Sequence, residues 1–192
     1  KMVIVKNYKE LKQAIKNKKL ASMFGVEGGH MIEDNLDNLN TFYDRGTRYM
    51  TLTWNNSTSW ATSAMAETTK KDSLALTHKG LTDFGKQVVK RMNELGMVVD
   101  VSHVGEQTFW DVINTTTKPV MASHSNAYAL CPVFRNLKDE QILAIGKNGG
   151  VIDLNFYAGF VDSSFRSKEI KFIFSHAREF DSLRETGVQR EY

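Results

Sequence analysis

Cysteine and proline are scarce in this sequence, and their scarcity excludes several classes of protein. The 192 residues contain one cysteine, Cys131, so neither an internal disulfide nor a zinc site built from several cysteines can form. Only two prolines are present, and the chain has no low-complexity tract and no repeated segment. These absences argue against separate modules and against a solenoid. We therefore expect residues 1–192 to form a single domain around one core.

Long apolar runs and a strong charge bias are also missing. No apolar segment approaches the roughly 20 residues of a membrane span, and the start, KMVIVKNYKELKQ, lacks the apolar region of a secretory signal. The net charge is only +3, and the tight basic clusters, at 16–19 and 70–71, are interpreted as solvated surface. The sequence thus predicts neither a membrane span nor a nucleic-acid-binding surface.

What the chain does contain is a regular alternation of strand-like and helical patterns. Five apolar segments have the length of strands: LASMFGVEGG, RYMTLTW, MVVDVSH, PVMASHS and GGVIDLNFY. Helical periodicity lies between them, and a long polar connection runs from Asn55 to about Thr77. The first segment is expected to be one buried strand that ends at Gly28 and Gly29. Alternation of this kind predicts parallel strands joined by helices, and hence an α/β fold.

Polar side chains recur at one place in these units, namely at or just after the end of each strand. The residues concerned are Glu27, Thr53, His103, His124 and Asn155. In parallel α/β folds the carboxyl ends of the strands form the edge where ligands bind. We therefore expect these side chains to face one crevice.

Two histidines and a glutamate at this edge suggest a metal site. His103 and His124 each follow an apolar strand and a serine, in DVSH and ASHS. Together with Glu27 they form a ligand set that zinc prefers. The alternative is that each histidine only caps its strand by bonding a loop carbonyl. Asp100 would either orient a ligand histidine or be satisfied locally.

Other candidate residues have simpler explanations. Arg135 could hold a substrate carboxylate through two parallel hydrogen bonds, but the sequence alone favours a surface arginine paired with Asp139 or Glu140. Cys131 is interpreted as an inert, small apolar residue. The remaining histidines are assigned to loop or helix positions without a metal: His30, His78 and His176.

Six blocks of the chain, between about residues 24 and 162, resemble the membrane (renal-type) dipeptidases, the zinc-dependent peptidase family M19. The blocks are GVEGGH, RGTRYMTLTWNN, GLTDFGKQVVKRMNELGMVVDVSHV, PVMASHSNA, RNLKDEQ and GGVIDLNFY. The resemblance implies a (β/α)8 TIM barrel of the amidohydrolase-like group. Because such a barrel needs roughly 250 residues, residues 1–192 are expected to form one incomplete barrel domain of about five βα units.

The resemblance also implies roles for individual residues. Glu27 would bridge two zinc ions, with His103 and His124 completing the second of them, and Arg135 would bind the free carboxylate of a dipeptide. The implied reaction is hydrolysis of the dipeptide bond by a hydroxide shared between the metals. A soluble bacterial-type member, in the cytoplasm or periplasm, is expected. Exposed strand edges of a partial barrel predict a homo-oligomer.

Departures from the family pattern define the alternatives. The His-x-Asp pair that holds the first zinc and the later GSDFDG-type aspartate are absent from this chain. It would therefore hold one zinc ion or none, and could be a catalytically silent, self-associating partial barrel. Trp54 stands where many relatives have a substrate-binding histidine; it would line the substrate pocket and shift the preference, with lactones or other amides as the alternative substrates. Extracellular relatives have a disulfide between a cysteine at the position of Cys131 and a second cysteine further along the chain. This chain has Ser163 at the second position.

Overall fold

A five-stranded sheet lies at the centre of the computed structural model, which describes residues 1–69, 76–179 and 181. Its strands follow one another in sequence order, and every neighbouring pair is parallel. They are β3 (Phe24–Glu27), β4 (Thr47–Thr51), β5 (Val98–Asp100), β6 (Met121–Ala122) and β7 (Val151–Ile152). The predicted α/β fold with parallel strands is therefore confirmed.

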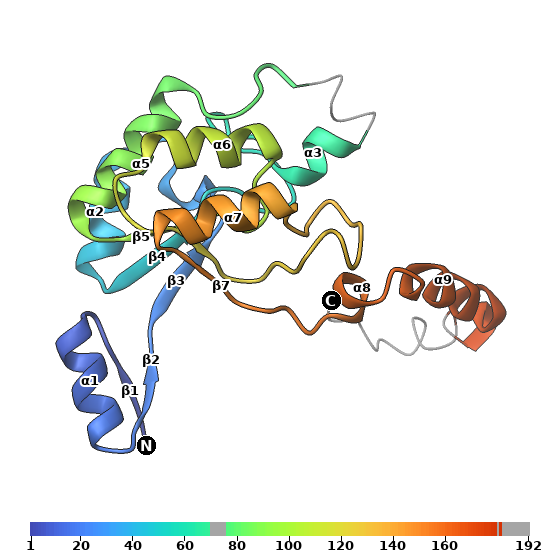
Figure 1. The fold of residues 1–192 in the computed structure, drawn as a ribbon, viewed down its shortest axis with the longest axis horizontal. Helices are drawn as coiled ribbons and strands as arrows, with labels where there is room; N and C mark the ends of the chain where they lie inside the picture. Colours follow the sequence, from blue (N-terminus) through green and yellow to red (C-terminus); the bar gives the residue numbers. More distant parts are fainter. Residues whose placement is uncertain (70–75, 180, 182–192) are drawn as a thin grey trace.

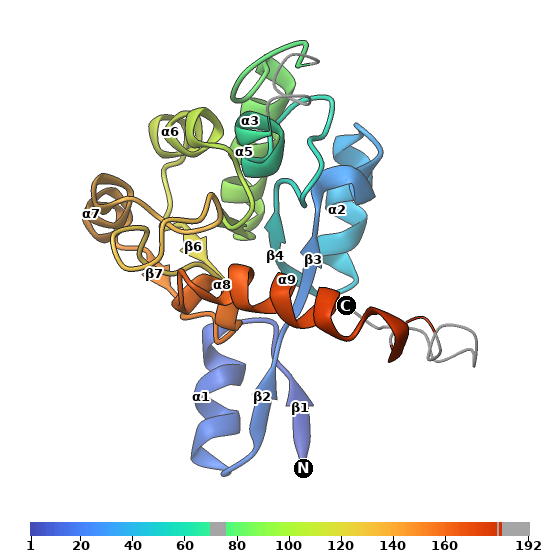
Figure 2. The ribbon, with the colours of Figure 1, turned by 90° about the vertical axis from the view of Figure 1, so that its right-hand side faces the viewer.

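Four helices alternate with these strands and pack as a row along one face of the sheet (Figures 1 and 2). They are α2 (Leu36–Asp44), α5 (Asp83–Leu95), α6 (Glu106–Thr115) and α7 (Asp139–Asn148). Each helix contacts the next one in the row. Strands on the inside of an arc with helices on the outside form a section of a (β/α) barrel, as expected from the sequence.

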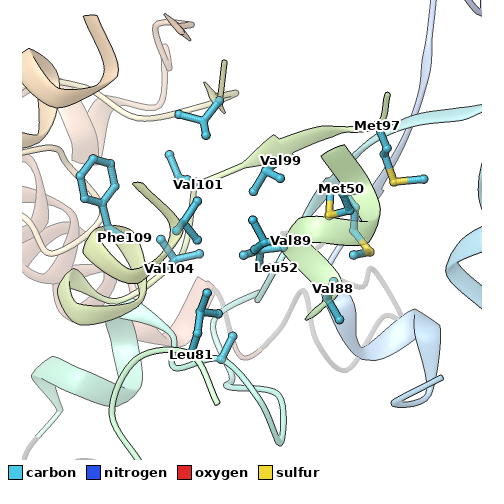
Figure 3. Packing of buried hydrophobic residues seen from close by; sticks show 14 of the residues in the cluster. Met50, Leu52, Leu81, Val88, Val89, Met97, Val99, Val101, Val104 and Phe109 are labelled. Atoms are coloured by element: carbon cyan, nitrogen blue, oxygen red, sulfur yellow. The ribbon is translucent and has the colours of Figure 1, made fainter. Parts of the chain in front are cut away.

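The hydrophobic core lies between the sheet and this row of helices. Met50 of β4 and Val99 of β5 are neighbours in register, and both face Val88 and Val89 of α5 (Figure 3). Because side chains alternate along a strand, the next register pair, Thr51 and Asp100, points to the opposite face. The core thus fixes which strand residues are presented to the inside of the arc.

Helix ends follow local sequence signals. The side chain of Thr82 accepts a hydrogen bond from the backbone N–H of Gly85 and so caps α5. The same helix ends at Gly96, which adopts a left-handed conformation with φ of 76°. Gly149 ends α7 in the same way. These caps hold the helices at the lengths that the connections to β5 and β7 require.

The first apolar segment, LASMFGVEGG, does not form one buried strand as expected. It divides into β2 (Leu20–Ser22), which pairs only with β1 (Met2–Ile4), and β3, which joins the large sheet. With α1 (Tyr8–Lys16), β1 and β2 form a small parallel unit beside the main sheet (Figure 1). Because β3 is an edge strand, its Phe24 remains 51% exposed.

The connection that was expected to be irregular from Asn55 to about Thr77 contains a short helix, α3 (Ala64–Thr68). The cluster at 70–71 lies outside the described residues. The remaining elements are the 3-10 helix η1 (Gly29–Ile32), α8 (Ala158–Val161) and α9 (Phe165–Ser175). Among the described residues no helix has both the length and the apolar character that crossing a membrane requires.

Candidate metal centre

Three side chains from three different strand ends meet at the carboxyl edge of the sheet. Glu27 is the last residue of β3, and His103 and His124 follow β5 and β6. The Nε2 atoms of His103 and His124 lie 3.0 and 3.3 Å from the same carboxylate oxygen, Oε1 of Glu27. The two imidazole rings lie edge to face, with their centroids 4.9 Å apart. The predicted convergence of these three residues is therefore present in the fold.

The backbone at His103 adopts an unusual conformation that directs its ring to this point. Its φ is +67°, a region that non-glycine residues seldom occupy. The segment before α3 holds this turn in place: the His103 carbonyl accepts from the N–H of Ala64 at 2.8 Å, and the N–H of Gly105 donates to the Thr62 carbonyl at 2.8 Å. A strained local conformation is thus maintained by contacts from a segment about 40 residues away in sequence.

Electrostatics at the site keep both imidazoles neutral. Burial, reinforced by the positive charge of Arg135 and by His124, lowers the pKa of His103 to about 3. Burial and Arg135 also lower the pKa of His124, although Asp100 and Glu27 oppose the shift. A neutral imidazole has one nitrogen lone pair available, which is the form that binds metal ions.

Asp100, at the end of β5, is fully buried and bonds neighbouring strand ends rather than a histidine ring. Its carboxylate accepts from Thr51 on one side and from Ser123 on the other. The Ser123 hydroxyl in turn lies 2.7 Å from Nδ1 of His124. Both interpretations of Asp100 therefore hold in part, because it is satisfied locally and reaches His124 through one hydroxyl.

Arg135 lies in the loop between β6 and α7, and the expected surface pairing with Asp139 or Glu140 is wrong. Its Nε and Nη2 atoms are buried and have no hydrogen-bond partner within the described residues. Its guanidinium lies over the ring of Phe160, 5.2 Å from the centroid. Burial lowers its pKa to about 10, while Glu27 and Asp100 favour the charged form. The group is therefore a cation with unused donors.

A cavity of about 440 Å³ connects this arginine with His103. His103 and Arg135 both line it, together with the aromatic residues Tyr128 and Phe134. Trp54 is 49% exposed, and its ring lies 6.4 Å from that of His103. A ligand in this cavity would contact a cation, an imidazole and apolar walls.

The other strand-end residues do not join the three candidate ligands. Thr53 is buried, and its hydroxyl has no partner in the described part of the chain. The side chain of Asn155 accepts from the N–H of Tyr157, and its own N–H donates to Asn126. These contacts organise the loop after β7 rather than the metal site.

The remaining histidines and the cysteine lie where the sequence placed them. His30 is an exposed residue of η1, and His176 ends α9. The Nε2 atom of His78 is buried without a partner in the described chain, although its loop lies outside the three-residue cluster. Cys131 is fully buried and unpaired, as expected for a small apolar residue.

Two supporting features were not recognised from sequence. One is the stretch around Ser63 and Ala64, which holds the His103 turn. The other is the set of hydroxyls around Asp100, which includes Ser102 and Ser123. The serine before each histidine, in DVSH and ASHS, was a visible signal for the second feature.

Comparison with curated proteins finds a relative with a similar sequence. An uncharacterised dipeptidase of Schizosaccharomyces pombe is 40% identical to this chain over 145 residues. The matched region covers 76% of this chain and 34% of the yeast protein. This chain therefore spans about a third of the length of that relative.

Two solved structures have a fold similar to that of this chain. A metallopeptidase from Rhodobacter sphaeroides, bound to a phosphinate mimic of the dipeptide L-Ala-D-Ala, is 27% identical with a TM-score of 0.76, and the match covers 84% of this chain and 45% of that one. The probable dipeptidase PvdM of Pseudomonas aeruginosa is 28% identical with a TM-score of 0.71, over 80% and 38% of the two chains. Residues 1–185 match the family model described as membrane dipeptidase (peptidase family M19), and this chain therefore belongs to that family.

Proposed function

We propose that this chain forms part of a zinc-dependent dipeptidase, in which Glu27, His103 and His124 bind zinc and Arg135 binds the substrate carboxylate. The observation that carries the proposal is the cluster of donor atoms. One atom from each of the three ligands lies within 4.8 Å of the other two. We place all of these roles in one partial barrel domain, residues 1–192.

The chemistry of the donor set fits zinc. Two imidazoles and a carboxylate match the ligands of catalytic zinc sites, which leave a coordination position open. The imidazoles are kept neutral by burial and by Arg135, so each can offer a lone pair. Both Nε2 atoms approach the same carboxylate oxygen of Glu27, so a cation bound among them would be ligated by all three residues. When bound, zinc supplies Lewis-acid activation of the scissile carbonyl and of the attacking water.

This chain's residues account for one zinc ion, with Glu27 able to contribute to a second. The three residues form the one cluster of potential ligands found among the described residues. The side chain of Glu27 is 51% exposed, so its carboxylate remains accessible. A second ion would require ligands from outside this cluster, in agreement with the missing His-x-Asp pair.

Arg135 would select the substrate by its carboxylate. A guanidinium with buried, unpartnered donors beside a cavity is suited to a planar anion, because two parallel hydrogen bonds match the geometry of a carboxylate. A free carboxylate one residue from the scissile bond is a property of dipeptides. The dipeptide mimic bound by the Rhodobacter metallopeptidase supports this substrate class.

The experiment that tests the proposal combines zinc titration with dipeptide hydrolysis in the intact protein. Glu27→Gln should weaken zinc binding by more than about 100-fold, beyond the roughly 10–100-fold effect of outer residues, and should abolish turnover. Glu140→Gln, an exposed carboxamide substitution on α7, is the matched control and should change neither. Absence of zinc binding by the wild type, or full activity of Glu27→Gln, would refute the proposal.

The same assay separates the alternatives. Zinc binding without turnover of any substrate would support a catalytically silent protein. Because Trp54 lies beside His103, a panel that includes lactones and other amides tests whether this indole changes the substrate class. Preference for lactones over dipeptides would replace the dipeptidase assignment with the third candidate.

A further inference from the structure

A buried carboxylate that forms no salt bridge within the described residues organises the carboxyl edge of the sheet. Asp100 is 0% exposed, and each of its two carboxylate oxygens accepts two hydrogen bonds. Oδ1 accepts from the N–H groups of Ser102 and Ser123, at 2.9 and 3.0 Å. Oδ2 accepts from the hydroxyls of Thr51 and Ser123, at 2.6 and 2.5 Å. Asp100 therefore ties the ends of β4, β5 and β6 together.

The hydroxyl of Ser123 has one proton and several neighbours, so its donor role can be assigned. Oδ2 of Asp100 lies at 2.5 Å, whereas Oγ of Ser102 lies at 3.4 Å. A carboxylate is the stronger acceptor and the nearer one, so the hydroxyl donates to Asp100. The remaining short contact, 2.7 Å to Nδ1 of His124, then requires the ring to donate to Ser123, and it is shorter than the 3.3 Å that separates Nε2 from the competing acceptor, the Glu27 carboxylate.

This direction of bonding determines which nitrogen of His124 is available. With the proton on Nδ1, the lone pair of the neutral ring lies on Nε2, the atom that faces Glu27 at 3.3 Å. We infer that Ser123, held by Asp100, is a positioning residue that fixes the tautomer and orientation of His124 for a divalent cation. The inference rests on the proposed function, because it concerns the same metal site.

His124 is held by side chains, whereas His103 is held mainly by its backbone. The N–H of His124 also donates to Oγ of Ser102 at 3.0 Å, which fixes the residue at a second point. Nδ1 of His103 is buried and has no partner in the described part of the chain. Loss of the Ser123 hydroxyl should therefore change His124 selectively and leave the environment of His103 unchanged.

The tautomer can be observed directly in the intact, metal-free protein. Long-range ¹H–¹⁵N correlation spectra at mildly alkaline pH distinguish Nδ1–H from Nε2–H histidines, and wild-type His124 should show the Nδ1–H pattern. Ser123→Ala should lose this preference, and Ser123→Thr, which keeps the hydroxyl, should restore it. Ser125→Ala removes a neighbouring buried hydroxyl that bonds no histidine ring and serves as the matched control. An Nε2–H pattern for wild-type His124 would overturn the inference.

Zinc titration of the same variants gives the second measurement. Ser123→Ala should weaken zinc binding by roughly 10–100-fold, as is typical when a group that orients a ligand histidine is removed. Ser123→Thr and Ser125→Ala should bind zinc as the wild type does. Equal affinities of Ser123→Ala and the wild type would refute this inference alone, whereas a wild type that binds no zinc would refute the proposed function. Backbone amide spectra establish that each variant is folded.

Discussion

The guanidinium of Arg135 carries two buried nitrogen atoms without partners in the described chain, so a ligand that bonds them gains free energy. Arg135→Lys keeps the charge but loses the planar pair of donors. One bond to a charged group is worth about 1.5–3 kcal/mol, so the KM for dipeptides should rise about 10–100-fold, with a smaller change in kcat.

The control for this prediction is Arg166→Lys on α9, where the exposed arginine pairs with Glu169. Steady-state kinetics of both variants distinguish a general effect of replacing an arginine by lysine from the loss of a substrate contact at the site. An unchanged KM for Arg135→Lys would show that this arginine does not bind the substrate.

His103 makes the stability of the metal-free protein depend on pH. Its pKa is about 3 in the folded state because of burial and Arg135, and it is about 6.5 in the unfolded chain. Between these values the unfolded state binds a proton that the folded state does not. The free energy of unfolding should therefore fall as the pH is lowered from about 6.5 towards 3. Above that range His103 is neutral in both states and does not reduce the stability.

Urea unfolding of the wild type and of His103→Gln across this range measures the contribution. Glutamine does not titrate, so the stability difference between the two proteins should shrink as the pH falls. Parallel pH profiles would show that His103 has the same proton affinity in both states. Acidic groups that do not contact His103 titrate in both proteins and cancel in the comparison.

The short helix α3 supports the site by connecting to the start of α6. Glu67 accepts from the hydroxyl of Thr62 at 2.7 Å and from the N–H of Glu106, in the first turn of α6, at 2.9 Å. A carboxylate at this position satisfies a free N–H and interacts favourably with the helix dipole. Glu67→Ala should lower the free energy of unfolding by about 1–2 kcal/mol.

Chemical denaturation of Glu67→Ala tests this connection between the two helices. Glu94→Ala, which removes an exposed i,i+3 partner of Arg91 on α5, is the control and should change stability by less than about 0.5 kcal/mol. Similar values for the two variants would mean that Glu67 does not hold α6 in place.

Elements with a complete local signal could be predicted from the sequence. The helix that begins after Thr82 and ends at Gly96 combines apolar periodicity with caps at both ends, and both caps are formed by short-range bonds. The helix α3 has a local signal only at its start, where Ser63 caps it, and its first residue, Ala64, is also fixed by the backbone of His103 far along the chain. The division of LASMFGVEGG at Met23 likewise depends on which strand each half pairs with.

The site was predictable for a different reason, which concerns the whole molecule. Parallel strands place their carboxyl ends at one edge, so residues far apart in sequence, such as Glu27, His103 and His124, meet whenever the strands are in order. The pairing state of Arg135 could not be predicted, because its burial depends on the path of the long loop and on Phe160. The sequence therefore predicts the positions of the candidate metal ligands better than it predicts the contacts of the surrounding loop residues.

The open arc of strands predicts association of residues 1–192 with a second copy. Its edge strands, β3 and β7, carry exposed apolar side chains: Phe24 is 51% and Val151 is 52% exposed. After β7, Leu154 and Phe156 are 71% and 93% exposed. Unpaired strand edges and adjacent apolar surface favour pairing with an identical edge. Light scattering of this chain should therefore show dimers or larger species whose fraction rises with concentration.

A charged substitution at the most exposed of these positions tests where the copies meet. Phe156→Lys should shift the equilibrium towards the monomer, because association would bury an unpaired ammonium group. Phe172→Lys is the comparison, since Phe172 is also exposed but belongs to α9, a helix that lies away from the sheet edge (Figure 1). A well-folded wild type that is monomeric at all concentrations would contradict the prediction. Equal effects of the two substitutions would show that association does not depend specifically on the sheet edge, because only Phe156 follows β7 directly.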